Sequence, residues 1–287
     1  MDAKDVRHVG VIGCGLMGSG IAEVCARAGL RVTFVEGSAE LVASGHGRIR
    51  RSVDAAVGRG KLEQADATAL LARIDGVTSL SGLADTDLVI EAATEDRDAK
   101  LAIVGELDAT LRHEVVIASN TSSIPIGSLG AASGRADRVI GMHFFNPPPV
   151  MSLLEITPSV DTSGETLAFV WAFGTDVLGK TCVRSSDEAG FIVNRLLIPY
   201  LYDAIRLFER GFATRDDIDT AVRLGLAHPM GPLALSDLIG LDTVLNIGEV
   251  LRDAFGDDRY DPPAVLRTLV HEGKLGRKSG SGFYDYG

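Results

Sequence analysis

Short apolar runs alternate with amphipathic segments over the first two thirds of the chain. The amphipathic segments have apolar residues at helical spacing, and each follows an apolar run of strand length. An alternation of this kind is typical of α/β proteins in which helices cover a mostly parallel, doubly wound sheet. We expect strands at 9–12, 30–35, 87–93, 115–118, 138–142, 153–156 and 181–184, and helices at 19–29, 39–60, 64–73, 97–112 and 162–178.

The pattern changes near residue 187. From there the apolar positions keep a helical spacing, and no strand pattern of comparable strength appears after 185. Helices are expected from 187 to about 211, from Thr214 onward, and over 233–255 and 262–272. We therefore expect two domains, an α/β domain over 1–186 and an all-α domain over 187–287. The glycine-rich tail around 276–284 is predicted to be a loop that packs back on the protein.

A glycine-rich turn stands between the first strand and the first helix. It has the spacing G-x-G-x-x-G, which in this setting is typical of dinucleotide binding in a Rossmann-type domain. The helix that follows would offer its N-terminal N–H groups to a pyrophosphate. The six residues of the turn are Gly13, Cys14, Gly15, Leu16, Met17 and Gly18.

Glu36 follows the second predicted strand, about 20 residues after the glycines. An acid at this place can accept hydrogen bonds from ribose hydroxyls and would repel a 2′-phosphate, so NAD is favoured over NADP. The alternative is a glycine turn in an ordinary strand–helix–strand unit, with Glu36 as a solvated strand end. The agreement of strand, glycines and acid in one register favours the dinucleotide.

Composition and charge exclude several classes of function. The 287 residues are 46% hydrophobic and carry a net charge of −11, which disfavours a broad nucleic-acid or anionic-membrane surface. Three cysteines without C-x-x-C spacing favour a reducing cytoplasmic location and disfavour a zinc site. We expect no signal peptide and no membrane span.

One segment of this acidic chain is basic. Five bases and one acid, Asp54, lie between 46 and 61. The segment is either a solvated helical face or an anchor for a phosphorylated ligand, since Arg and Lys pair with phosphate oxygens. The bases are Arg48, Arg50, Arg51, Arg59 and Lys61.

Candidate chemistry gathers where predicted strands end. His143 directly follows a buried strand, and Glu155 ends the next one, so adjacent strands could pair carboxylate with imidazole. Asn120 and Ser122 follow an inner strand, where they could equally satisfy backbone groups of a turn. Asn194 is a polar residue on an apolar helical face, which fits an interhelical hydrogen bond or a substrate contact.

Together these segments resemble the L-3-hydroxyacyl-CoA dehydrogenases, and most closely the bacterial 3-hydroxybutyryl-CoA dehydrogenases. The resemblance runs from Val9 to Tyr284 and rests on the glycine turn and four further motifs. These motifs are Ser119-Asn120-Thr121-Ser122-Ser123, His143-Phe144-Phe145-Asn146-Pro147, Gly190-Phe191-Ile192-Val193-Asn194-Arg195 and Gly231-Pro232.

The resemblance implies roles for particular residues. His143 matches the catalytic base, Glu155 its paired carboxylate, and Ser122 and Asn194 the groups that orient the substrate. The basic segment matches an arm over the CoA phosphates, for which Arg51 and Lys61 are our candidates among the bases. Positions matching contacts to NAD, besides the glycine turn and Glu36, are Glu95, Lys100, Ser122, Asn146 and Lys278.

The expected reaction is hydride transfer between (S)-3-hydroxyacyl-CoA and NAD, which gives 3-ketoacyl-CoA. We expect a homodimer, because an apolar helical surface in the second domain would be buried between subunits. One alternative is a β-hydroxy-acid dehydrogenase acting on free acids, which would carry Lys at the place of Asn194. Another is a cofactor-binding structural or regulatory protein, against which the complete polar set argues.

Overall fold

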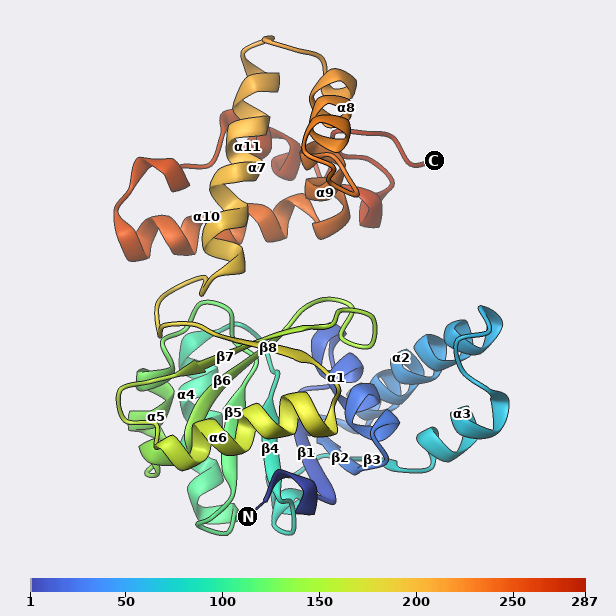
Figure 1. The fold of residues 1–287 in the computed structure, drawn as a ribbon, viewed down its shortest axis with the longest axis vertical. Helices are drawn as coiled ribbons and strands as arrows, with labels where there is room; N and C mark the ends of the chain where they lie inside the picture. Colours follow the sequence, from blue (N-terminus) through green and yellow to red (C-terminus); the bar gives the residue numbers. More distant parts are fainter. Residues whose placement is uncertain (1) are drawn as a thin grey trace. The chain divides into compact units, whose positions relative to one another are not determined.

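The computed structural model describes residues 2–287 and divides them into two compact units. The first unit extends to Glu188 and the second is Ala189–Gly287. The division falls two residues beyond the boundary expected from the sequence. Figure 1 shows a sheet with helices in the first unit and helices alone in the second.

The first unit is built on one eight-stranded sheet with the order β3-β2-β1-β4-β5-β6-β7-β8. Every neighbouring pair is parallel except β6 and β7, which are antiparallel. The doubly wound, mostly parallel sheet expected from the alternating pattern is confirmed. The strands are β1 (His8–Ile12), β2 (Arg31–Val35), β3 (Ile74–Val77), β4 (Leu88–Glu91), β5 (Val116–Ser119), β6 (Val139–Phe144), β7 (Leu153–Pro158) and β8 (Thr181–Arg184).

The central strands are buried along their whole length, as their apolar composition requires. Helices cover the sheet, and α6 crosses in front of the strands in Figure 1. The helices of this unit are α1 (Leu16–Arg27), α2 (Ala39–Gly58), α3 (Gln64–Leu71), α4 (Arg97–Thr110), α5 (Ile126–Ala132) and α6 (Gly164–Ala172). Short 3₁₀ turns are η1 (Ala3–Asp5), η2 (Leu80–Leu83) and η3 (Ala136–Arg138).

Some expected boundaries in the first unit were wrong. Helix α1 begins at Leu16 rather than Ser19, because the helix follows the glycine turn without a spacer. Ala28 is the exposed C-cap, whereas Glu23 is buried on the helix and pairs with Arg27 at 2.6 Å. The predicted helix over 162–178 ends as α6 at Ala172 and continues as one wider π-helical turn, Phe173–Val177.

The second unit consists of five helices in the described chain: α7 (Val193–Glu209), α8 (Arg215–Gly225), α9 (Pro232–Ile239), α10 (Leu241–Phe255) and α11 (Ala264–His271), with 3₁₀ turns η5 (Asp258–Tyr260) and η6 (Arg277–Ser279). The expected helical start at 187–190 was wrong, because α7 begins at Val193, after Gly190 and Phe191 adopt positive φ values of 76° and 46°. The single helix expected over 233–255 is two helices, because Gly240 turns the chain with φ 102°.

The tail folds back on the second unit, as expected. Phe283 is buried in its core with Tyr202 and Leu266. The Asp237 carboxylate, 1% exposed, accepts the backbone N–H groups of Phe283 and Tyr284, each at 2.9 Å, and the hydroxyl of Tyr286 at 3.0 Å. One buried acid therefore fixes the end of the chain.

Candidate functional site

The glycine turn has the geometry that close approach of a phosphate requires. Gly13 has φ 81°, and a Cβ there would lie 2.8 Å from the Ala92 carbonyl oxygen. A Cβ on Gly18 would collide with the Gly13 carbonyl oxygen, so helix and turn meet only with glycine at both places. Nothing lies within 4 Å of a Cβ built on Gly15, which leaves the turn open above the N-terminus of α1.

Two charged side chains frame this turn. Glu36, at the end of β2, accepts the backbone N–H of Cys14 through Oε1 at 2.6 Å. Arg48 of α2 donates through Nη1 to the Cys14 carbonyl oxygen at 3.2 Å. An open, glycine-lined helix N-terminus with a carboxylate beside it fits the pyrophosphate and adenosine ribose of NAD.

The antiparallel pairing of β6 and β7 brings His143 and Glu155 together. These residues are direct cross-strand partners, and His143 Nδ1 lies 2.7 Å from Glu155 Oε2. Glu155 is fully buried and His143 is 8% exposed, with the Phe145 ring 4.7 Å from the imidazole centre. The expected strand end was wrong, since β6 continues through His143 to Phe144. The sheet register therefore sets the orientation of the imidazole.

The loop after β5 is held by hydrogen bonds from both sides. Asn120 Oδ1 accepts the backbone N–H of Phe144 at 2.8 Å, which ties the loop to β6 beside His143. On the other side, Glu95 Oε1 accepts Thr121 Oγ1 at 2.6 Å, and Ser122 N and Ser123 Oγ at 2.9 Å each. The side chain of Asn120 thus satisfies a backbone group, whereas Ser122 is half-buried and its backbone N–H donates to Glu95.

A buried ion pair next to this loop was not predicted from the sequence. Lys100 Nζ lies 2.6 Å from Glu91 Oε1, and the two side chains are 1% and 0% exposed. The same ammonium lies 3.5 Å from Glu95 Oε2. Burial raises the pKa of Glu95, but the Lys100 charge and the hydrogen bonds from Thr121, Ser122 and Ser123 outweigh it, so the pKa lies below its usual value. An acid inside an apolar strand, nine residues before a lysine, was the available signal.

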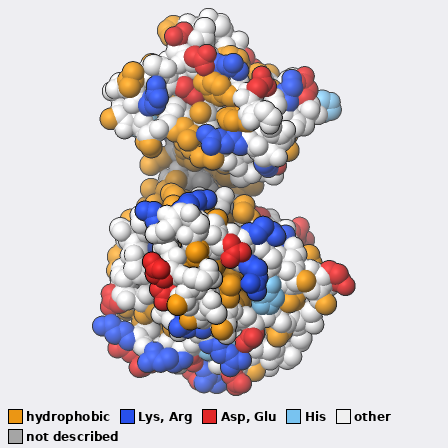
Figure 2. Space-filling view, turned by 90° about the vertical axis from the view of Figure 1, so that its right-hand side faces the viewer, with side chains coloured by type: hydrophobic (Ala, Val, Ile, Leu, Met, Phe, Trp, Pro, Cys, Tyr) orange, Lys and Arg blue, Asp and Glu red, His pale blue; other side chains and the backbone are white. Residues whose placement is uncertain are grey.

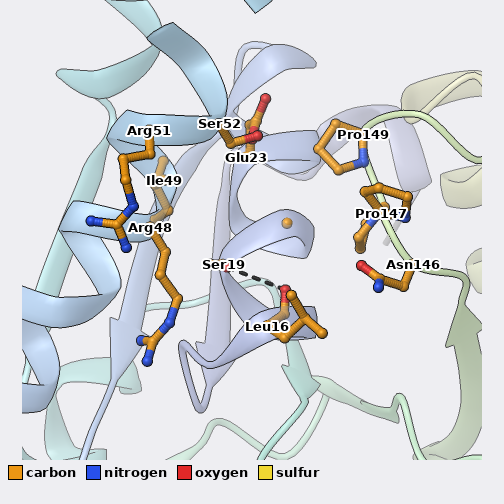
Figure 3. A pocket seen from close by; sticks show the side chains of 12 residues that line it. Leu16, Ser19, Glu23, Arg48, Ile49, Arg51, Ser52, Asn146, Pro147 and Pro149 are labelled. Carbon is orange, nitrogen blue, oxygen red and sulfur yellow. Dashed lines mark hydrogen bonds between the residues drawn. The ribbon is translucent and has the colours of Figure 1, made fainter. Parts of the chain in front are cut away.

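The basic helix and the proline loop line a shared pocket of about 240 Å³ (Figure 3). Arg48 and Arg51 line it from α2, and Ser19 and Glu23 from α1. Asn146 and the following prolines form its other side, after a cis Asn146–Pro147 bond. Of the two CoA candidates, Arg51 is thus on the pocket wall. Lys61 is exposed beyond the end of α2 and is not among the lining residues.

Two of the expected site residues belong to the second unit. Asn194 is 8% exposed in the first turn of α7. Lys278, in η6, forms an ion pair with Asp242 at 2.5 Å. The described residues include no cluster of His, Cys, Asp and Glu suited to a metal ion. Within 2–287, none of the helices has the length and apolarity needed to cross a membrane.

Comparison with known proteins gives this arrangement a family context. Residues 8–188 match the family model described as 3-hydroxyacyl-CoA dehydrogenase, NAD binding domain, and residues 190–286 match its C-terminal domain. A 3-hydroxybutyryl-CoA dehydrogenase of Mycobacterium tuberculosis is 48% identical over 98% of this chain and 99% of its own. A probable 3-hydroxybutyryl-CoA dehydrogenase of Deinococcus radiodurans is 46% identical over 96% and 99%.

Solved structures agree with these matches. The crystal structure of M. tuberculosis FadB2 has a TM-score of 0.96 at 48% identity and covers 98% of this chain and 99% of its own. That of (S)-3-hydroxybutyryl-CoA dehydrogenase PaaH1 from Ralstonia eutropha has a TM-score of 0.92 at 46% identity, covering 99% and 100%. The glycine turn, Glu36 and both domain matches therefore place the chain in the 3-hydroxyacyl-CoA dehydrogenase family, with NAD as its cofactor.

Proposed function

We propose that this enzyme interconverts (S)-3-hydroxybutyryl-CoA and acetoacetyl-CoA with NAD, using His143 and Glu155 as an acid–base pair. The observation that carries the proposal is the 2.7 Å contact between His143 Nδ1 and a fully buried Glu155 carboxylate. The names of the relatives from M. tuberculosis and R. eutropha support the choice of a four-carbon substrate.

Glu155 determines which nitrogen of the His143 imidazole exchanges a proton with the substrate. A carboxylate at Nδ1 accepts the N–H there, so Nε2 is the nitrogen that exchanges a proton with substrate. In the oxidation direction, Nε2 takes the 3-hydroxyl proton and Glu155 stabilises the resulting imidazolium. In the reduction direction, the imidazolium returns that proton to the developing alkoxide. NAD, when bound, supplies the hydride acceptor for C3.

Polar groups around the imidazole orient the substrate. Ser122 stands on the loop that Asn120 ties to β6, next to His143. We assign to Ser122 and Asn194 the task of holding the reacting oxygen and the thioester. Arg51 lines the pocket between α2 and the proline loop. We assign it to the CoA phosphates, because a guanidinium can donate two parallel hydrogen bonds to phosphate oxygens.

The proposal is tested with purified enzyme, acetoacetyl-CoA and NADH. We expect turnover with the thioester and little with free 3-ketobutyrate or with NADPH. His143→Gln is expected to lower kcat about 10²–10⁴-fold, the usual contribution of general acid–base catalysis, while the Kd for NADH stays within about twofold. Retained turnover in this variant would refute the role of His143, and an inactive wild type would refute the proposed substrate.

We further propose that the enzyme is a homodimer joined through its second unit. Large apolar side chains stand exposed there, including Phe212 at 78%, Leu224 at 72% and Leu196 at 69%. Figure 2 shows apolar side chains in patches on this unit. Light scattering coupled to size exclusion should give twice the mass of 30.3 kDa. A Leu224→Glu change should shift the enzyme toward the monomer.

A further inference from the structure

The proline loop, residues 145–152, connects β6 to β7 and forms one side of the pocket described above. Its turn is closed by backbone hydrogen bonds, since the Pro147 carbonyl oxygen accepts the N–H groups of Val150 and Met151 at 2.9 and 3.0 Å. The side chains of Val150 and Met151 are exposed, so their own packing does little to hold the loop. The loop therefore needs contacts from the elements on either side of it.

One such contact comes from helix α1. Pro148 is the buried residue of the loop, and a Cβ built on Gly20 of α1 would lie 2.6 Å from Pro148 Cδ. Glycine at this position therefore lets the loop approach the helix without a shift of either. Because Gly20 and Pro148 both line the pocket, its width here depends on how closely the loop rests on α1.

The other contact comes from Lys180, which stands directly before β8 and does not line this pocket. Its ammonium donates to the carbonyl oxygens of Pro148 and Met151, each at 2.7 Å. Hydrogen bonds from a charged donor at this distance are among the stronger ones in proteins. The backbone N–H of Lys180 is bound in turn by the Gly174 carbonyl oxygen, in the π-helical turn, at 2.9 Å. One side chain thus joins two points of the loop to a fixed strand end.

We propose that Lys180 is a positioning residue that fixes the proline loop as a wall of the pocket and thereby strengthens binding of the CoA part of the substrate. A loop that is ordered before binding loses less conformational freedom when the ligand arrives. The inference rests on the proposed function, because the pocket is assigned to CoA through Arg51, which lies across it from the loop (Figure 3). Lys180 was not among the site residues expected from the sequence.

Hydrogen exchange measures the loop itself, without substrate. In Lys180→Met the side chain keeps nearly its full length and loses its donors. We therefore expect the N–H groups of Val150 and Met151 to exchange with deuterium about tenfold faster than in wild type, or faster still. Mass spectrometry of a peptide that spans 145–152 gives the rates. Exchange at the wild-type rate would overturn the proposal, because the loop would then be held without Lys180.

Binding and kinetics then locate the effect along the substrate. For Lys180→Met we expect the Kd for CoA, measured by calorimetry, and the KM for acetoacetyl-CoA to rise about tenfold, while kcat stays within about twofold. The acetoacetyl thioester of N-acetylcysteamine lacks the phosphates and the adenosine, so its KM should change less than about twofold. An equal rise in KM for both thioesters, or a fall in kcat with an unchanged KM, would overturn the proposal by placing the effect at the reacting end of the substrate.

Two further variants separate positioning from a general loss of stability. Lys180→Arg keeps a cation with donors for both carbonyl oxygens, so its Kd for CoA should lie within about threefold of wild type. Lys4→Met is the matched control, because Lys4 is an exposed lysine of the same unit that lies 3.9 Å from Asp176. It should change neither the exchange of the loop nor the Kd for CoA. An equal loss of CoA binding in Lys4→Met would contradict a specific role for Lys180.

The proposed function and this inference can fail separately. If wild type reduces neither acetoacetyl thioester, the proposed substrate is wrong, whereas the exchange of the loop and the Kd for CoA still decide the role of Lys180. If wild type reduces both thioesters and Lys180→Met binds CoA as tightly as wild type does, the proposed function stands and the inference about Lys180 is wrong.

Discussion

Each unit contains a cluster of acids that fixes a loop or the tail, and only one of the two clusters includes a cation. In the first unit, Glu91 and Glu95 share the ammonium of Lys100. In the second, Asp237 receives hydrogen bonds from the tail, and the nearby charge of Asp219 opposes its ionisation. The cluster with a cation holds a loop of the proposed site, and the cluster without one holds the end of the chain.

The pKa values follow this difference. Glu95 has a lowered pKa, because Lys100 and the loop donors outweigh its burial. Asp237 has a raised pKa, because burial and the Asp219 charge outweigh the donors of Phe283, Tyr284 and Tyr286. A buried carboxylate with a cation stays ionised more readily, whereas hydrogen bonds alone do not fully replace the water that burial removes. The comparison suggests three experiments, which differ in the size of the expected effect.

Replacing Glu91, the acid that pairs with Lys100, should cause the largest loss of stability. We expect Glu91→Gln to lower the free energy of unfolding by about 3–5 kcal/mol, because Lys100 is then left buried with only the more distant Glu95. Urea unfolding followed by circular dichroism measures the change. The paired variant Glu91→Gln/Lys100→Gln should recover most of it, and a paired variant as unstable as the single one would break the comparison.

Replacing Asp237, the acid that has hydrogen-bond donors but no cation, should cause a smaller loss of stability. Asp237→Ala leaves the N–H groups of Phe283 and Tyr284 without their acceptor, and we expect a loss of about 2–3 kcal/mol by the same measurement. Because the tail loses its anchor, limited proteolysis should cut near residue 280 faster than in wild type. Asp253→Ala, at an exposed position of α10, is the control and should change neither property.

Acidification should change the stabilising contributions of Glu95 and Asp237 in opposite directions. This effect should be smaller than that of either substitution above. The Glu95 pKa is lowered in the folded state, so its stabilisation is present above about 4.5 and is lost as pH falls through the folded value. The Asp237 pKa is raised, so the folded state gains stability relative to the unfolded chain as pH falls through the folded value toward 3.8.

Two variants resolve these opposite contributions. Melting temperatures measured from pH 7 to pH 3 should show the advantage of wild type over Glu95→Gln shrinking once the pH falls below about 4.5. Over the same range the melting temperature of wild type should rise relative to that of Asp237→Asn, because the asparagine side chain stays neutral. Parallel curves for either variant would contradict the direction assigned to that acid.

Local patterns predicted most of the fold, because strands and helices are marked by periodicity and by caps. Ser38 and Thr214, each directly before a helix, accept the N–H groups of Leu41 and Asp217. The break at Gly240 was missed, because apolar spacing continues across it and only its φ of 102° separates α9 from α10.

The candidate site was predictable where chemistry coincides with strand ends. The spacing of His143 and Glu155 suggested adjacent strands, but the antiparallel reversal that makes them direct partners is a property of the assembled sheet. Glu91 was counted only as part of a buried strand, because nothing local shows that Lys100 returns beneath it from α4. Long-range pairing of this kind depends on topology, which a single sequence states only indirectly.

The pairing of β6 with β7 also bears on how this gene can tolerate insertions. The His143–Glu155 pair depends on register, and side chains in a strand alternate between the two faces of the sheet. One codon added within either strand would move the imidazole or the carboxylate to the opposite face, while the rest of the fold survived. In an insertion library of this gene, codons for 140–144 and 154–157 should therefore yield folded but inactive protein.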